Sequence, residues 1–144
     1  MLALLVQVAD ARLAIDVRDV VQVLPMARLE RHALGPSSLA GLLVFHGRLI
    51  PTFDLSVLRA GQPTAARLRS RLIAIQSYQA GEEQPYAICV DQVMDVRSFA
   101  DDEFVPGRLL LDDQGPIEPI DVRRLLPPDV SAWLGSFCAA EVGG

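Results

Sequence analysis

The sequence predicts an all-β fold, in which two small barrels of short strands pack together. The chain has 144 residues, of which 51% are hydrophobic and 22% charged, as expected for one globular domain. Its apolar segments are short, rich in Val, Ile and Leu, and bounded by Gly, Asp and Pro, which is typical of strands in a barrel or sandwich. Several of these segments recur once along the chain, which indicates two related halves.

The clearest repeat pairs LAIDVRDVVQV at 13–23 with YAICVDQVMDV at 86–96. Five positions are identical without a gap: Ala14/Ala87, Ile15/Ile88, Val17/Val90, Val20/Val93 and Val23/Val96. Each copy follows an apolar run and a polar turn. Because the pattern occurs only twice, it favours a pair of barrels over a solenoid.

A second repeat pairs IPTFDLSVL at 50–58 with IEPIDVRRL at 117–125, and each copy follows a Gly-bounded turn. Asp54 and Asp121 hold equivalent positions in it. We expect each to cap a strand end, where the chain enters a short helical piece, by accepting backbone N–H bonds. Acid–base work by paired carboxylates is the alternative. A unit of about 60 residues is marginal alone, so each barrel should bury a face against its twin.

The stretch GQPTAARLRS at 61–70 is the expected junction between the halves, because it contains Gly, Pro and small residues. Residues 1–128 are expected to form a single domain, with approximate, partly intertwined sub-barrels at 1–65 and 66–128.

A helix is expected from residue 129, with Asp129 as its cap and a frayed tail, EVGG, at its end. Four of its residues fall on one face, which is expected to pack on a barrel: Val130, Trp133, Leu134 and Phe137.

Charge and hydropathy exclude several classes of partner. The net charge of −5 offers no basic face for nucleic acid or for anionic lipid. The apolar run at the N-terminus stops at Asp10, so it is interpreted as a strand and not as a signal peptide. No run approaches the ~20 apolar residues of a membrane helix. A cytoplasmic protein without membrane insertion is expected.

The candidate catalytic residues are sparse. His46 lies beside Gly47 at an expected hairpin tip, and His32 lies in an irregular segment. Their spacing fits no metal motif, and neither a metal nor a cofactor is expected. Cys89 alternates with apolar residues on an expected strand, where a small buried residue is the simpler interpretation. A hydrolase would need Cys89, His32 and His46 to converge, whereas a protein-binding role needs only exposed apolar surface.

Four segments in order resemble the CheW-like family, the adaptor domain of bacterial chemosensory signalling. They are LALLVQV with LAIDVRDVVQVLP, GLLVFHGRLIPTFDL, AICVDQVMDV, and VPGRLLLDDQGPIEPIDVRRLL. The spacing of five residues in the second segment is the most specific part: Gly41, Gly47, Pro51, Asp54 and Leu55. The resemblance implies two five-stranded SH3-like barrels with exchanged strands, no catalysis, and a bridge between a CheA-type histidine kinase and the cytoplasmic tips of methyl-accepting chemoreceptors.

The same resemblance assigns receptor contacts to Val20, Gln22, Gly41 and His46. The family usually has Asn-Leu-Arg-Gly where this chain has Val-Phe-His-Gly at 44–47, and Glu where it has Gln22. An imidazole lacks the fixed, forked charge of Arg. These departures favour an alternative chemosensory array, such as one that governs surface motility, pili or a second messenger.

Two readings therefore remain open beside the enzyme. The first is an adaptor at membrane-associated receptor arrays, which also binds a homologous barrel domain of the kinase. The second is a small-molecule-sensing regulatory module on the same fold, for which the chain offers no convergent polar cluster.

Overall fold

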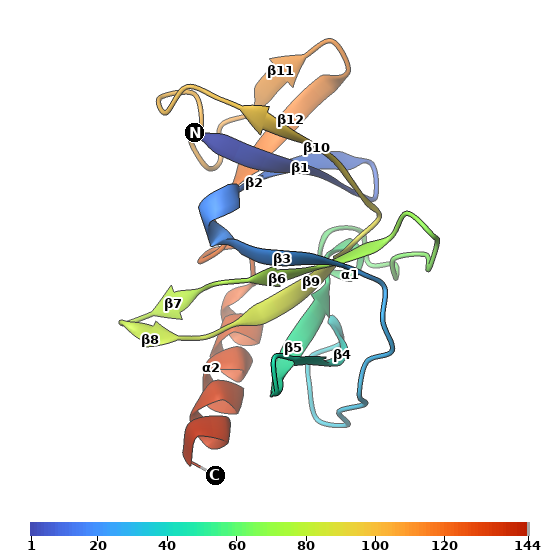
Figure 1. Ribbon diagram of the computed structural model, residues 1–144, viewed down its shortest axis with the longest axis vertical. Helices are drawn as coiled ribbons and strands as arrows, with labels where there is room; N and C mark the ends of the chain where they lie inside the picture. The colour runs from blue at the N-terminus through green and yellow to red at the C-terminus, as the bar shows by residue number, and fades with distance from the viewer. Residues whose placement is uncertain (144) are drawn as a thin grey trace.

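Two five-stranded sheets, each curled into a barrel, make up most of the computed structural model (Figure 1). The structure describes residues 1–143, and side chains through residue 140. Barrel A contains, in spatial order, β10 (Gln92–Ser98), β1 (Leu2–Val8), β2 (Ala11–Asp16), β12 (Gly115–Ile120) and β11 (Leu110–Asp112). Barrel B contains β3 (Val20–Pro25), β6 (Arg71–Ile75), β9 (Tyr86–Val90), β5 (Arg48–Asp54) and β4 (Leu39–Phe45).

Short elements complete the chain: the 3-10 turn η1 (Val17–Asp19), helix α1 (Leu55–Ala60), the hairpin β7 (Tyr78–Gln79) and β8 (Glu82–Glu83), and helix α2 (Pro128–Gly143). The expected all-β fold of two SH3-like barrels with a C-terminal helix is confirmed. Residues 61–70, the expected junction, form the irregular connection between α1 and β6.

The internal repeat is visible in the strand order of the two barrels. Each strand of barrel A occupies the place of its repeat partner in barrel B, so that β10, β1, β2, β12 and β11 match β3, β6, β9, β5 and β4. The register is conserved as well, because Phe53 lies opposite Ile88 where Ile120 lies opposite Ile15. The two halves are therefore copies of one topology.

The repeated segments are also the points where the chain changes barrel. Residues 13–23 leave barrel A through β2 and enter barrel B through β3. Residues 86–96 leave barrel B through β9 and return through β10. Each sheet thus takes strands from both halves of the sequence, so the strands of the two halves are intertwined.

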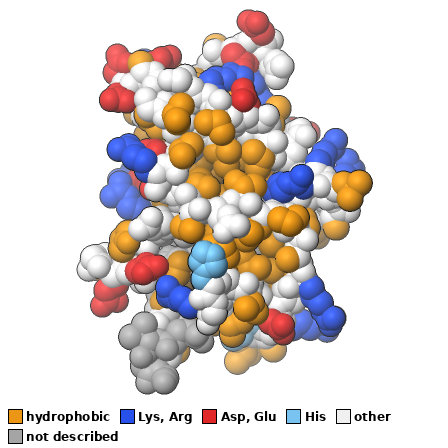
Figure 2. Space-filling model, in the orientation of Figure 1, with side chains coloured by type: hydrophobic (Ala, Val, Ile, Leu, Met, Phe, Trp, Pro, Cys, Tyr) orange, Lys and Arg blue, Asp and Glu red, His pale blue; other side chains and the backbone are white. Residues whose placement is uncertain are grey.

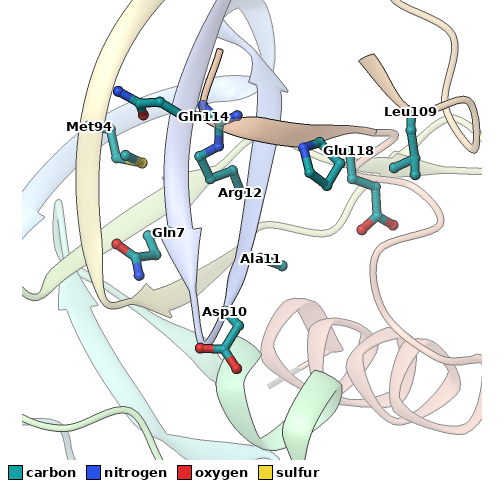
Figure 3. Close-up of a pocket in the computed structure, with 9 residues that line it drawn as sticks. Gln7, Asp10, Ala11, Arg12, Met94, Leu109, Gln114 and Glu118 are labelled. Atoms are coloured by element: carbon teal, nitrogen blue, oxygen red, sulfur yellow. The ribbon is translucent and has the colours of Figure 1, made fainter. Parts of the chain in front are cut away.

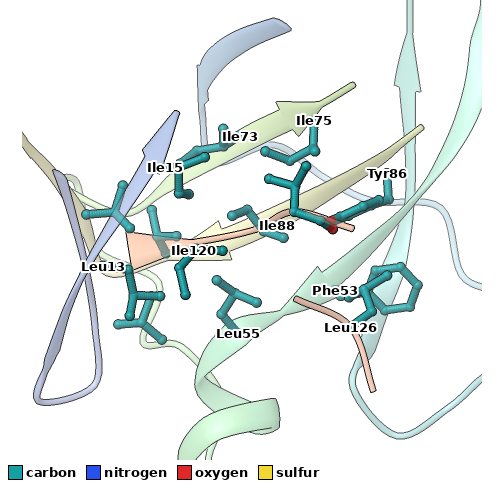
Figure 4. Close-up of a cluster of buried hydrophobic side chains, with 14 of the residues drawn as sticks. Leu13, Ile15, Phe53, Leu55, Ile73, Ile75, Tyr86, Ile88, Ile120 and Leu126 are labelled. Atoms are coloured by element: carbon teal, nitrogen blue, oxygen red, sulfur yellow. The ribbon is translucent and has the colours of Figure 1, made fainter. Parts of the chain in front are cut away.

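The largest core lies between the two sheets and belongs to both (Figure 4). Leu13 and Ile15 come from barrel A, and Ile73 and Ile88 from barrel B, all fully buried. Tyr86 is also buried, and its hydroxyl donates to the carbonyl of Val122, 2.6 Å away. A buried hydroxyl without a partner would be costly, so this bond makes Tyr86 compatible with the apolar core.

Each barrel has a smaller interior of its own, and the two interiors are closed differently. In barrel A the edge strands β10 and β11 are bridged by Asp112, which accepts from Arg97 Nη1 at 2.7 Å. Asp112 also accepts from Arg12 Nη1 at 2.9 Å. At the positions equivalent to Arg97 and Asp112, barrel B has Leu24 and Phe45, which pack against its interior. Ion pairs thus close one barrel, and apolar contacts close the other.

The expected capping role is confirmed for Asp54 and changed for Asp121. Asp54 is the N-cap of α1 and accepts from the backbone N–H of Ser56 at 3.0 Å. It also accepts from the backbone N–H of Thr64 at 2.8 Å, which anchors the connection that follows α1. Asp121 accepts from the backbone N–H of Arg123 at 3.0 Å, but a turn and not a helix follows it.

Helix α2 begins at Pro128, so Asp129 lies in its first turn and is not the expected cap. Proline suits this first position because its missing N–H would have no helical partner there. Val130 and Leu134 are buried in the inter-sheet core, and Trp133 packs at its margin, as expected. Phe137, the fourth residue of the expected face, is only half-buried and stacks on Trp133. The tail EVGG falls outside the described side chains, and Gly144 outside the described residues.

Gly41 on β4 is placed where the chain crosses itself closely. Glu30 forms an isolated bridge to Leu42, with both backbone hydrogen bonds at 2.8 Å. A Cβ at Gly41, whose φ is 152°, would lie 2.7 Å from the carbonyl oxygen of Glu30 and 2.7 Å from Leu29 Cβ. Only glycine allows this approach without displacement of the neighbouring backbone.

We expect Asp112→Asn to lower the melting temperature at pH 7, because Arg12 and Arg97 lose their shared carboxylate. These two guanidinium groups hold the pKa of Asp112 well below its ordinary value. The stabilisation is therefore complete above the ordinary carboxyl pKa of about 4 and is lost as the pH falls toward the lowered value. In thermal melts from pH 7 to pH 2, the melting temperatures of the unaltered protein and of Asp112→Asn should converge at the acidic end. A constant difference would show that Asp112 acts by shape alone.

We expect Gly41→Ala to destabilise the fold more than Gly61→Ala. Gly61 has a φ of 73° and open space around its Cβ position. The only penalty for alanine there is the left-handed backbone conformation, which costs about 1–2 kcal/mol. At Gly41 the crowding against Glu30 adds about 1–3 kcal/mol. Urea unfolding of the two variants measures the difference, and equal midpoints would contradict a steric role for Gly41.

Candidate functional site

The inter-sheet core reaches the surface along two equivalent edge strands, β3 and β10. On β3, Val20 and Val23 lie opposite Ile75 and Ile73 of the core. On β10, Val93 and Val96 lie opposite Val6 and Leu4 of the same core. Leu2 lies on the same face of β1 as Leu4, two residues away. We call this set the inter-barrel strip: Leu2, Val20, Val23, Val93 and Val96.

Three members of the strip are widely exposed: Leu2 at 53%, Val23 at 37% and Val96 at 51%. Figure 2 shows apolar side chains gathered across the middle of the molecule, on the face where β3 lies in Figure 1. An apolar surface that continues a core and is left open to water marks a site for a partner.

Matching β-bulges shape the strip on both strands. On β3, Val20 pairs with Ile75 and Gln22 with Ala74, so Val21 is the extra residue. On β10 the extra residue is Met94, which is the repeat equivalent of Val21. Both extra residues point outward, with 49% of Val21 and 40% of Met94 exposed. The conserved bulge gives the two edge strands the same pattern of buried and exposed residues from Val20 and from Val93 onward.

The four residues expected to contact a receptor lie in different surroundings. Val20 is half-buried at the base of the strip, and Gln22 is exposed on the other face of β3, opposite Ala74 of the barrel B interior. His46 is exposed at the tip of the β4–β5 hairpin. It lines a groove of about 300 Å³ together with Val21, the neighbour of Val20 and Gln22. Gly41 is buried, and its near neighbours are Leu29 and Glu30.

The hairpin at His46 has the geometry that its sequence indicates. His46 and Gly47 have φ values of 49° and 77°, as in the tight two-residue turns that join antiparallel strands. The imidazole stacks on Phe45 with ring centroids 4.0 Å apart. Stacking orients the ring, and its exposed edge is left to donate or accept a hydrogen bond.

The residues required for a hydrolase do not form a catalytic group. Cys89 is 2% exposed, and burial raises the pKa of its thiol to about 12, so the thiolate nucleophile is scarce. His32 packs edge-on against Trp133 and Phe137 of α2. No hydrogen bond joins Cys89, His32 and His46 to one another within the described residues. Nor does any group of three or more His, Cys, Asp or Glu side chains through residue 140 have an arrangement fit for a metal.

Sequence reasoning missed most of the strip. It named Val20 but not Leu2, Val23, Val93 or Val96, although Val23/Val96 and Val20/Val93 are identical pairs of the repeat. That identity was the available signal. It could not show which valines lie on the inter-sheet face, because the bulges shift the alternation of the strands.

Comparison with known proteins agrees with this architecture. A family model described as the CheW-like domain matches residues 2–120. Among solved structures, the scaffolding protein TtCheW from Thermoanaerobacter tengcongensis superposes with a TM-score of 0.73 and 19% sequence identity, covering 90% of this chain and 94% of that one. At that identity the likeness concerns the fold alone. No curated protein matches the chain.

No helix among the described residues is long and apolar enough to cross a membrane. The strand order, the doubled topology and the family match over residues 2–120 lead to one conclusion. The chain belongs to the CheW-like domain family.

Proposed function

We propose that this protein is a non-catalytic adaptor that couples a CheA-type histidine kinase to methyl-accepting chemoreceptors, and that it acts in the cytoplasm at receptor arrays. The inter-barrel strip carries the proposal, because it offers apolar side chains at the surface between two barrels. Its role is assembly: the strip receives the receptor tip, and a barrel pairs with the homologous domain of the kinase. Individually weak contacts of this kind gain strength when several are made together.

The departures at Gln22 and His46 narrow the choice of receptor. Neither side chain carries a fixed charge, and Val44 and Phe45 make the rest of the hairpin tip apolar. A receptor that matches this surface would rely on packing and neutral hydrogen bonds. That chemistry supports a pathway other than standard chemotaxis, such as surface motility, pili or a second messenger.

A small-molecule sensor is the weaker alternative. The groove beside His46 has the volume for a small ligand, but Arg48 and Glu83 on its wall already pair with each other at 3.4 Å. Few polar groups are left to orient a ligand. Calorimetry against a metabolite panel would support this alternative only if one compound binds in the groove and His46→Ala removes the binding.

We expect Val23→Asp and Val96→Asp each to weaken co-sedimentation with receptor-bearing membranes at least tenfold. A carboxylate in the centre of an apolar contact removes more than about 1.4 kcal/mol of binding. Leu34→Asp is the control, because Leu34 is 81% exposed in the irregular segment between β3 and β4, outside the strip and the hairpin tip. Equal loss in all three variants would mean that the strip has no special part in receptor binding.

We expect His46→Ala to fold normally and to weaken receptor co-sedimentation about fivefold, the effect of one neutral hydrogen bond of about 1 kcal/mol. Glu82→Ala, in the exposed β7–β8 hairpin, is the control. Unchanged binding would remove His46 from the set of contacts.

A pull-down tests the coupling to the kinase: tagged protein purified from its own cytoplasm should retain a multidomain histidine kinase. If no such kinase is recovered, the coupling role is wrong.

A further inference from the structure

The inter-barrel strip is nearly symmetric, so its apolar side chains do not define the direction of a bound partner. Val20 and Val23 on β3 are the repeat equivalents of Val93 and Val96 on β10, and both pairs lie against the inter-sheet core. A partner segment turned end for end would meet nearly the same arrangement of valines. A preference for one direction must therefore come from residues in which the two sides of the strip differ.

A groove lies beside each half of the strip. The barrel B groove, of about 300 Å³, is lined by Val21, and a barrel A groove of about 360 Å³ is lined by Met94 (Figure 3). These are the equivalent bulge residues, and each is next in the chain to a valine of the strip. Gln76 and Gln7 are a second equivalent pair on the two walls. The grooves are therefore matched extensions of the strip, one on each barrel.

Asp10 is the one charge of the barrel A groove that no described residue neutralises. Arg12 on the same wall is held by Asp112, and Glu118 is held by Arg59. Asp10 lies in the turn between β1 and β2, where it is exposed (Figure 3), and it forms no ion pair or hydrogen bond within the described residues. The groove thus presents one free carboxylate to a partner.

The rest of the barrel A groove suits the stem of a long basic side chain. Its wall is largely apolar, with Ala11, Met94, Leu109 and Pro116 among the lining residues. Lysine and arginine pack their methylene groups on apolar surface while the charged end stays in water. Such a side chain would lie along this wall and reach Asp10 with its charge.

The barrel B groove lacks a free carboxylate. Its only acidic residue, Glu83, already pairs with Arg48 at 3.4 Å. The other titratable group on its wall is His46, at the hairpin tip. A basic side chain placed here would meet a cation and an imidazole and no unpaired counter-ion. The two ends of the strip therefore differ in the charge that they accept.

We propose that the barrel A groove receives a basic side chain of the partner that binds the strip, with Asp10 as its counter-ion, and that this contact fixes the direction in which the partner lies. The inference rests on the proposed function, because it requires a receptor segment in the strip. That segment carries Lys or Arg toward barrel A and a neutral residue toward His46. Asp10 contributes more to specificity than to affinity, because an exposed ion pair stabilises little whereas facing like charges are strongly disfavoured.

Co-sedimentation with receptor-bearing membranes tests the contact. At about 0.05 M salt, Asp10→Asn should bind about threefold more weakly, through loss of an exposed ion pair, and Asp10→Lys at least about tenfold, through repulsion. Both differences should shrink at about 1 M salt, which screens exposed charges. Asp102→Asn is the control, because Asp102 is also an exposed carboxylate without an ion-pair partner among the described residues, and it lines neither groove. If Asp10→Lys binds as the control does, the proposal is wrong.

Photo-crosslinking tests the direction. A photoreactive phenylalanine analogue replaces Met94 in one protein and Val21 in another, because these equivalent residues are 40% and 49% exposed. The analogue at Met94 should capture a receptor peptide that contains Lys or Arg, and the analogue at Val21 a different peptide. When Asp10→Lys is added, at a protein concentration raised to restore occupancy, the two peptides should exchange positions or appear at both. An unchanged pattern of capture would overturn the proposal.

Val23→Asp distinguishes a failure of this inference from a failure of the adaptor role. If Val23→Asp loses receptor binding while both Asp10 variants keep it, the strip binds the receptor but the barrel A groove does not take part. If the unaltered protein does not co-sediment with receptor at all, the adaptor role and this inference are both wrong.

Discussion

Neither sheet of this protein can cover its own larger apolar face, and the inter-sheet core is the constraint on which the rest depends. Leu13 and Ile15 from one barrel and Ile73 and Ile88 from the other share a single buried layer. Because the chain crosses between barrels at both copies of the repeat, the barrels are connected twice as well as packed. The core reaches the surface along the edge strands β3 and β10, and the inter-barrel strip lies there.

The two barrels share one topology, but their surfaces have different chemistry. Barrel A closes with Asp112 between Arg12 and Arg97, whereas barrel B closes with apolar side chains at the equivalent positions. Barrel B also covers its outer edge with the segment around Glu30, and no described residue forms the equivalent bridge in barrel A. Two barrels with the same strand order can therefore engage different partners, as an adaptor that joins unlike proteins requires.

The sequence alone indicated the doubled β-fold, the tight turn at His46 and the cap at Asp54, because each depends on local chemistry or on visible repetition. The assignment of strands to the two sheets depends on pairing between residues far apart in the sequence. This assignment could not be derived from the order of the segments. The bulges at Val21 and Met94 were hidden for a different reason: the two copies carry the same extra residue, so they align without a gap. At Gly41 the structure shows a packing requirement, the close approach of the Glu30 backbone, that the sequence pattern did not reveal, and the receptor contact expected there stays a prediction.

The bulges also bear on what kind of partner fits the strip. An unpaired edge strand invites another strand to extend the sheet, and a bulge opposes this by interrupting the ladder and twisting the edge. Both edges beside the strip are bulged, at Val21 and at Met94. Main-chain pairing is therefore disfavoured there, while the side chains of Val23 and Val96 remain open to contact. A partner that presents a stripe of apolar side chains, as an amphipathic helix does, satisfies this surface better than an extended peptide.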